Sequence, residues 1–175
     1  MSQVATGVGR PRRGAGVIAY TPPLAACNGV GPVTTLSLDG EKPEYLARRS
    51  VTTVLTRLGI SPQRRDEVEL AVTELVVNAG RHAPGPRELR IRSGRDAVTF
   101  AVADGGGDHA AIARRLTDGG AGVDWFEEHG RGLQIVAALF PGACGAGACG
   151  ARPAEAGRGG AGLGKEVWIC VAVGG

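Results

Sequence analysis

The sequence is short of aromatic residues, of long apolar runs and of net charge. Aromatic side chains make up only 4% of the 175 residues, and the formal net charge is +3. No apolar run approaches the roughly 18 residues of a membrane-spanning helix, so no such helix is expected. The small net charge gives no reason to expect a direct nucleic-acid partner. The chain also lacks a Gly-X-Y period, which excludes a collagen-like protein.

Glycine is abundant instead, with 30 residues, and its distribution divides the chain. Residues 1–32 combine glycine and proline with few large apolar side chains, which predicts a flexible N-terminal tail. Residues 33–173 alternate periodic segments with short turns and predict one domain. Inside this domain, residues 141–164 consist mostly of Gly, Ala, Arg and Pro, which predicts a loose insertion.

The four cysteines are Cys27, Cys144, Cys149 and Cys170. Their spacing shows neither a disulfide framework nor a zinc-ligand pattern, which is typical of a reducing compartment. The stretch before Cys27 superficially resembles a lipoprotein signal, but two prolines interrupt its apolar core. These features together predict a cytoplasmic protein.

Hydrophobic periodicity predicts three helices and four strands. Ser61 followed by Pro62 signals a helix start, with serine at the N-cap and proline in the first turn. A hairpin beside helices favours an α+β fold, a two-layer α/β sandwich. The helices are expected at 43–58, 62–81 and 131–140, and the strands at 33–38, 87–93, 97–104 and 166–173.

The helix from Pro62 carries two stripes of residues. The apolar stripe, expected to be buried, contains Val68, Val72, Leu75 and Ala79. The second stripe, about 100° away, contains Glu67, Glu74, Asn78 and Arg81. Asn78 offers an amide oxygen suited to Mg²⁺ that also binds phosphate oxygens, and Glu74, one turn away, could deprotonate a hydroxyl nucleophile. From spacing alone, a solvated polar face is the commoner interpretation.

Two glycine-rich segments accompany this helix. Asp104 ends an apolar strand and precedes Gly105, Gly106 and Gly107. A carboxylate beside such bare backbone can accept a hydrogen bond from an exocyclic amine such as that of adenine. Residues 130–133, Gly-Arg-Gly-Leu, open the last helix, where backbone N–H groups favour phosphate.

In this order, the segments resemble the motifs of the GHKL ATPase superfamily, which includes gyrase, Hsp90, histidine-kinase and MutL-type ATP-binding domains. Residues 74–82 resemble the N box, 104–107 the first glycine box and 130–133 the second. The run from Glu74 to Ala83 is similar to that of the small RsbW- and SpoIIAB-like anti-sigma serine kinases. The resemblance implies the Bergerat ATP-binding fold, with a mixed, mostly antiparallel sheet and helices on one face.

The resemblance also implies roles for individual residues. Asn78 would ligate Mg²⁺, Glu74 would be the catalytic base, and Asp104 would bind the adenine amine. A helix-capping role is an equally good interpretation of His82. The ATP-binding positions would be Asn78, Arg81, His82, Asp104, Gly106, Gly130, Arg131, Gly132 and Leu133.

Residues 107–129 would form a mobile ATP lid, in which Trp125 and Phe126 face a partner or pack within the lid. One position departs from the family pattern, because Glu166 stands where family members commonly carry threonine. We expect this carboxylate to lie near Asp104 and to repel it or raise its pKa.

Two functions are compatible with the resemblance. The first is an ATP- and Mg²⁺-dependent serine/threonine protein kinase that regulates transcription. It would bind a sigma factor and transfer the γ-phosphoryl group to a serine of a STAS-type anti-anti-sigma protein, and it could form a homodimer. The alternative is a divergent module that binds ATP or a protein partner and transfers nothing. Glu74 and Asn78 favour the kinase, whereas Glu166 favours the binding module.

Overall fold

A computed structural model describes residues 32–117, 131–149 and 164–174. The tail before residue 32, most of the predicted lid with Trp125 and Phe126, and residues 150–163 lie outside this part. The described elements are β1 (Val33–Ser37), α2 (Pro43–Arg57), α3 (Pro62–His82), β2 (Glu88–Ser93), β3 (Ala97–Asp104), α4 (His109–Thr117), α5 (Arg131–Leu139), β4 (Cys144–Cys149) and β5 (Gly164–Ala172).

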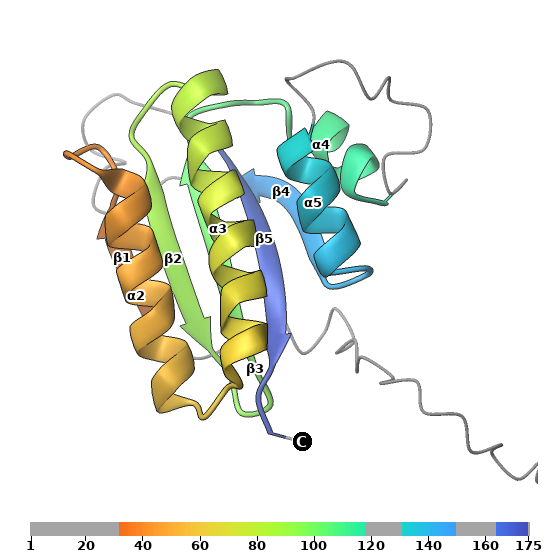
Figure 1. Ribbon diagram of the computed structural model, residues 1–175. Coiled ribbons are helices and arrows are strands. Elements are labelled where there is room, and N and C mark those ends of the chain that lie inside the picture. The colour runs from red at the N-terminus through yellow and green to blue at the C-terminus, as the bar shows by residue number, and fades with distance from the viewer. Residues whose placement is uncertain (1–31, 118–130, 150–163, 175) are drawn as a thin grey trace, which may run out of the picture.

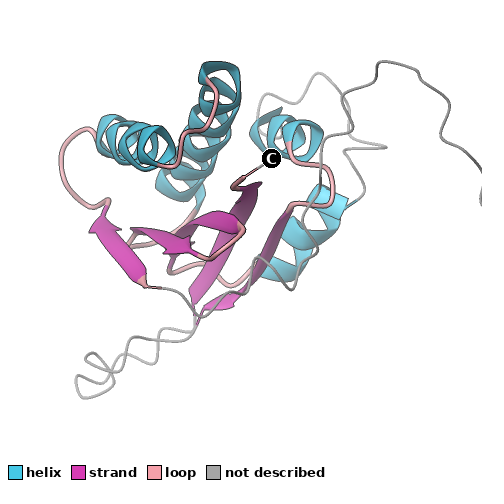
Figure 2. Ribbon diagram, turned by 90° about the horizontal axis from the view of Figure 1, so that it is seen from below, coloured by secondary structure: helices cyan, strands magenta, loops and turns pink. Residues whose placement is uncertain are grey.

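The strands form one five-stranded sheet in the order β1-β2-β3-β5-β4. Each pairing of these strands is antiparallel. The helices lie against one face of this sheet, as the two views at right angles show (Figures 1 and 2). The predicted two-layer α+β fold is therefore confirmed.

The core lies between the sheet and the helices. The four apolar residues predicted to be buried on α3 are all at most 4% exposed. They pack in one cluster with Phe100 of β3 and Ile169 of β5. The start of α3 also agrees with its sequence signal, because the Ser61 side chain accepts a hydrogen bond from the Arg64 N–H. The apolar stripe therefore determines which face of α3 meets the sheet, and the polar stripe is left away from the core centre.

The prediction of a loose segment over 141–164 is wrong for residues 144–149, which form β4. This strand pairs with β5 in register, with Gly145 opposite Trp168 and Cys149 opposite Gly164. A side chain at Gly145 would collide with the Trp168 indole, so this glycine admits the ring. Glycine and alanine have low strand propensity, but the backbone hydrogen bonds to β5 do not depend on side chains.

A second difference is α4, which occupies residues predicted as part of the lid. The sequence did carry a helix signal there, since Asp108 precedes an alanine-rich run with Ile112 and Leu116 one turn apart. Leu116 is buried in the core cluster and Ile112 packs against it. These two side chains fix α4 against the rest of the domain.

The cysteine expectation also needs correction. Cys144 and Cys149 are not part of a disulfide, but Cys170 is disulfide-bonded. Cysteine usage therefore no longer argues for a reducing compartment. The helices of the described segments include none with the length and apolar character of a membrane span.

Candidate functional site

Most of the predicted site residues lie at one end of the domain, at the top of Figure 1, where α3 and β3 end and α5 and β5 begin. The Gly105 N–H donates a hydrogen bond to the Pro84 carbonyl at 2.9 Å, which ties the end of β3 to the loop after α3. The β3–β5 register places Asp104 directly opposite Lys165. Segments separated by up to about a hundred residues in sequence therefore form one surface.

The first part of this surface is formed by α3 and α5. Glu74 and Asn78 face the first turn of α5, where Gly132 approaches both side chains. A Cβ at Gly132 would lie 2.6 Å from Glu74 Oε2 and 3.2 Å from Asn78 Nδ2. Any residue with a Cβ at this position would displace the Glu74 carboxylate, so glycine is required for the observed packing. The contact joins the predicted N box to the predicted second glycine box.

The side-chain amide of Asn78 is the buried polar group at this contact. Its Nδ2 atom is buried and has no hydrogen-bond partner among the residues that the structure describes. A buried amide without a partner is costly, so native proteins rarely leave one unsatisfied. Rotation of the amide presents either its nitrogen to a phosphate oxygen or its oxygen to a metal ion. The site therefore fits a phosphate group with Mg²⁺ at this position.

The second part of the surface surrounds Asp104, whose side chain is 2% exposed. Asp104 Oδ1 accepts a hydrogen bond from the Gly106 N–H at 2.8 Å. The same oxygen forms an ion pair with Lys165 Nζ at 2.9 Å. The carboxylate predicted to receive an adenine amine thus already has two donors from the chain itself.

Lys165 also forms an ion pair with Asp108 Oδ1 at 2.9 Å. Burial opposes the charge of Lys165, but hydrogen bonds to Asp104 and Asp108 outweigh this effect and raise the pKa of the lysine. The hydrogen bond from Lys165 lowers the pKa of Asp108. Both shifts favour the charged forms of Lys165 and Asp108. The lysine thus joins two carboxylate side chains in one cluster at the end of the sheet.

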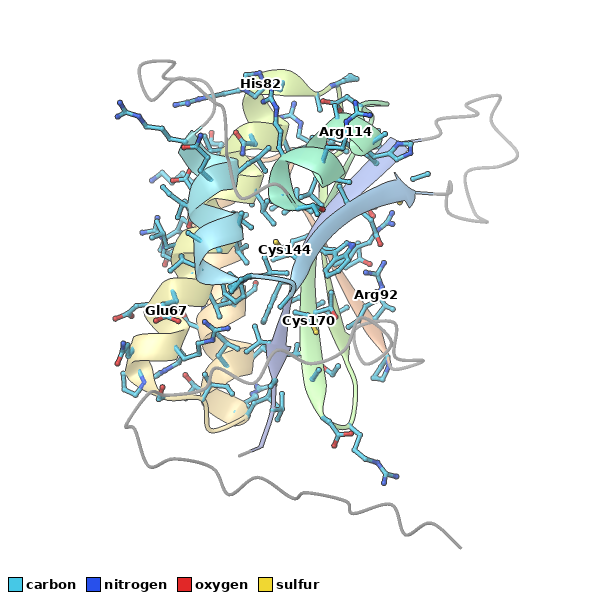
Figure 3. All side chains as sticks on the ribbon, turned by 90° about the vertical axis from the view of Figure 1, so that its right-hand side faces the viewer. Glu67, His82, Arg92, Arg114, Cys144 and Cys170 are labelled. Carbon is cyan, nitrogen blue, oxygen red and sulfur yellow. The ribbon has the colours of Figure 1, made fainter. Side chains whose placement is uncertain are left out.

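The expectation that Glu166 lies beside Asp104 and repels it is wrong. Adjacent strand residues point to opposite faces, so Lys165 shares the helix-covered face with Asp104 while Glu166 lies on the other face. There, Glu166 forms ion pairs with Arg92 at 2.8 Å and Arg90 at 3.5 Å. Figure 3 shows Arg92 on the side of the sheet away from the helices. Glu166 consequently gives no argument against nucleotide binding.

The other predicted residues occupy different places. Arg81 and His82 are exposed at the end of α3, and Figure 3 shows His82 at the same end of the domain as Arg114 of α4. Arg131 is exposed at the start of α5. Leu133 packs against the core. Gly130 lies outside the described residues.

One member of the polar stripe of α3 does not belong to the site. Glu67 forms an ion pair with Arg64 at 2.6 Å. Arg64 in turn donates to the Leu139 carbonyl at the far end of α5 and lies 4.4 Å from the Phe140 ring centroid. Figure 3 shows Glu67 and His82 toward opposite ends of α3. The stripe therefore contains both a structural ion pair and the candidate site.

Sequence reasoning missed Lys165 and Asp108 as site residues. A signal was present for the lysine, because it alternates in phase with the apolar residues Val167, Ile169 and Val171 that face the core. Asp104 alternates in the same way with the apolar residues of its own strand, so both side chains lie on the face of the sheet that meets the helices. Asp108 could be related to Lys165 only once the turn after β3 was known.

Comparison with known proteins adds one match. The model of the histidine kinase-like ATPase domain family matches residues 41–141, from the loop before α2 to the residues after α5. No curated protein sequence matches the chain significantly. The matched range includes Glu74 and Asn78 of α3 and Gly132 of α5. It also includes Asp104, but not Lys165.

Proposed function

Because the chain belongs to the histidine kinase-like ATPase domain family, an ATP-binding family, we propose that it is an ATP- and Mg²⁺-dependent protein kinase. Its substrate is a serine of a STAS-type anti-anti-sigma protein, and a sigma factor is its second partner. The proposed location is the cytoplasm, where ATP is available, and the disulfide at Cys170 is an observation against it. The GHKL-type motifs and the run from Glu74 to Ala83 support this assignment.

The observation that carries the proposal is the contact of Glu74 and Asn78 with Gly132. Asn78, whose buried Nδ2 atom has no hydrogen-bond partner among the described residues, would hold the phosphates and Mg²⁺. When bound there, Mg²⁺ would supply positive charge to the phosphate oxygens. Glu74, one helical turn away, is then within reach of a hydroxyl group that approaches the terminal phosphate.

The transfer itself requires little covalent chemistry from the protein. The serine oxygen forms a bond to the γ-phosphorus, the bond from that phosphorus to the bridging oxygen breaks, and ADP leaves. Glu74 accepts the hydroxyl proton. Most of the rate enhancement comes from holding the two reactants in line. Substitution of Glu74 should therefore lower transfer far more than it lowers ATP affinity.

The test is transfer of ³²P from γ-labelled ATP to candidate STAS-type proteins, together with Mg-ATP calorimetry. We expect Asn78→Ala to lose both ATP binding and transfer. Glu74→Gln should retain binding and lose about 10²-fold or more in transfer, since general base catalysis contributes about 10²–10⁴-fold. Glu67→Gln is the matched control, because it makes the same change on the same helix outside the site.

The alternative function is a module that binds ATP or a protein partner without transferring phosphate. One observation favours this alternative, namely the ion pair between Lys165 and Asp104, the residue predicted to bind the adenine amine. Binding of Mg-ATP by the wild type without transfer to any serine-bearing partner would support this alternative. Absence of Mg-ATP binding by both the wild type and the Lys165 variant described below would refute the kinase proposal.

A further inference from the structure

The ion pair between Lys165 and Asp104 lies where the family resemblance places the nucleobase. The lysine side chain is 5% exposed and the aspartate side chain 2%, so neither group is a surface charge. An exocyclic amine that is to bind Asp104 Oδ1 meets an oxygen that already accepts from the Lys165 ammonium and the Gly106 N–H. The base site is therefore occupied by a side chain of the protein itself.

The space at Gly106 leads to the same conclusion. A Cβ at this glycine would collide with Lys165 Nζ and would lie 3.0 Å from Asp104 Oδ1. The room that the absent side chain leaves beside the carboxylate is thus taken by the lysine ammonium. A planar base could enter this room only after the ammonium has left it.

Lys165 has a second carboxylate to which it can move. Asp108 Oδ1 lies 2.9 Å from the ammonium, and its side chain is 59% exposed, in contrast to that of Asp104. The Asp108 carbonyl accepts hydrogen bonds from the Ala111 and Ile112 N–H groups, so the residue stands at the N-terminus of α4. The helix dipole favours a negative charge there. The lysine can therefore release Asp104 and remain paired with Asp108 near solvent.

We propose that Lys165 competes with the nucleobase for Asp104, so that nucleotide binding transfers the ammonium from Asp104 to Asp108. This inference rests on the proposed ATP binding and adds the residue that sets its affinity. In the free protein, Lys165 satisfies Asp104. In the complex, the exocyclic amine takes the place of the ammonium at Asp104. The displaced ammonium remains paired with Asp108, at the N-terminus of α4.

The first consequence concerns affinity. Binding exchanges a charged hydrogen bond within the protein for a neutral one to the base, and charged hydrogen bonds are the stronger kind. Removing the lysine should therefore tighten Mg-ATP binding by about tenfold, which corresponds to about 1.4 kcal/mol. Methionine has a similar length and no charge, so Lys165→Met is the direct test.

Calorimetry with Mg-ATP compares four proteins: the wild type, Lys165→Met, Asp108→Asn and Lys42→Met. We expect Lys165→Met to bind about tenfold more tightly than the wild type. Asp108→Asn, at an exposed position, should bind several-fold more weakly because the displaced ammonium loses its alternative partner. Lys42→Met makes the same change at an exposed lysine outside the cluster and should bind as the wild type does.

A second measurement uses the small number of lysines. Lys42 and Lys165 are the only lysines in the sequence, so amine-reactive labelling followed by peptide mapping reads each one separately. In the free protein Lys42 should label quickly and Lys165 slowly, in line with their exposure. Addition of Mg-ATP should accelerate labelling of Lys165, because its ammonium moves toward solvent, and should leave Lys42 unchanged.

Several outcomes would overturn the inference. Equal or weaker Mg-ATP binding by Lys165→Met would mean that the lysine does not compete with the base, as would protection of Lys165 from labelling by Mg-ATP. If the wild type binds Mg-ATP and these results follow, the competition is refuted while ATP binding stands. If neither the wild type nor Lys165→Met binds Mg-ATP, the proposed function fails as well. Should Lys165→Met fail to fold, unchanged affinity of Asp108→Asn would refute the transfer.

Discussion

Replacing Gly132 with alanine tests the contact on which the phosphate side of the site depends. The new Cβ would lie 2.6 Å from Glu74 Oε2 and 3.2 Å from Asn78 Nδ2. The first distance is shorter than atoms in proteins tolerate, so the Glu74 carboxylate must move. It is the end of a flexible side chain, and therefore we expect the helix packing to remain.

The free energy of unfolding should change little, because two effects oppose each other. Alanine in place of helical glycine stabilises by up to about 1 kcal/mol. A displaced, off-rotamer Glu74 costs about 0.5–1.5 kcal/mol. The net change should therefore stay within about 1 kcal/mol. Transfer should fall by about 10²-fold, which is the usual cost of moving a catalytic group by about 1 Å.

The assay combines urea unfolding with single-turnover transfer of labelled phosphate. Gly80→Ala is the matched control, because it also replaces a helical glycine, but its Cβ would meet only Arg87 Nη1 at an ordinary 3.6 Å. This control should raise the free energy of unfolding by about 0.5–1 kcal/mol and leave transfer unchanged. Transfer by Gly132→Ala at the wild-type rate would refute the assigned role of the Glu74 position.

Three further predictions concern the rest of the domain. Glu166→Gln removes the charge that pairs with Arg92 and Arg90. It should lower the free energy of unfolding by about 1–2 kcal/mol and leave the Mg-ATP affinity in calorimetry unchanged. A gain in Mg-ATP affinity would instead support repulsion between Glu166 and Asp104. Burial raises the pKa of Cys144 from 9.0 to about 11. Because the thiol of the unfolded chain loses its proton at lower pH than the folded one, the free energy of unfolding should fall as pH rises from 9 to 11. Cys144→Ala should remove this part of the pH dependence in urea titrations. Phe100→Ala should lower the free energy of unfolding by about 3–5 kcal/mol, since this ring is fully buried in β3; a loss below about 1 kcal/mol would contradict its place in the core.

Local patterns predicted most of the fold. The apolar stripe of α3 and the Ser61 cap determine a helix at their own positions, because helix periodicity and capping involve residues only a few positions apart. The strands β2 and β3 follow from alternation and a short turn for the same reason. Boundaries differed by one or two residues, as fraying helix ends allow.

Of the features that were missed, α4 had a local helix signal, whereas β4 and the contact of Asp108 with Lys165 depend on distant partners. β4 has no strand signal of its own, because Gly and Ala carry little β propensity, and it exists through backbone pairing with β5. The turn that brings Asp108 to Lys165 likewise joins residues far apart in the chain. No local pattern contains that information.

The sequence by itself determined the two-layer α+β class, the buried face of α3 and the neighbourhood of Glu74 and Asn78 on one helix. The fold class follows from the order of helical and strand segments, and the two features of α3 follow from the periodicity of that one helix. The tertiary structure decided which groups face them: Gly132 against Glu74 and Asn78, and Lys165 rather than Glu166 against Asp104. The physical reason is strand register, since a shift of one residue moves a side chain to the opposite face of the sheet. That register, set by pairing between β3 and β5, places an ammonium group where a carboxylate was expected.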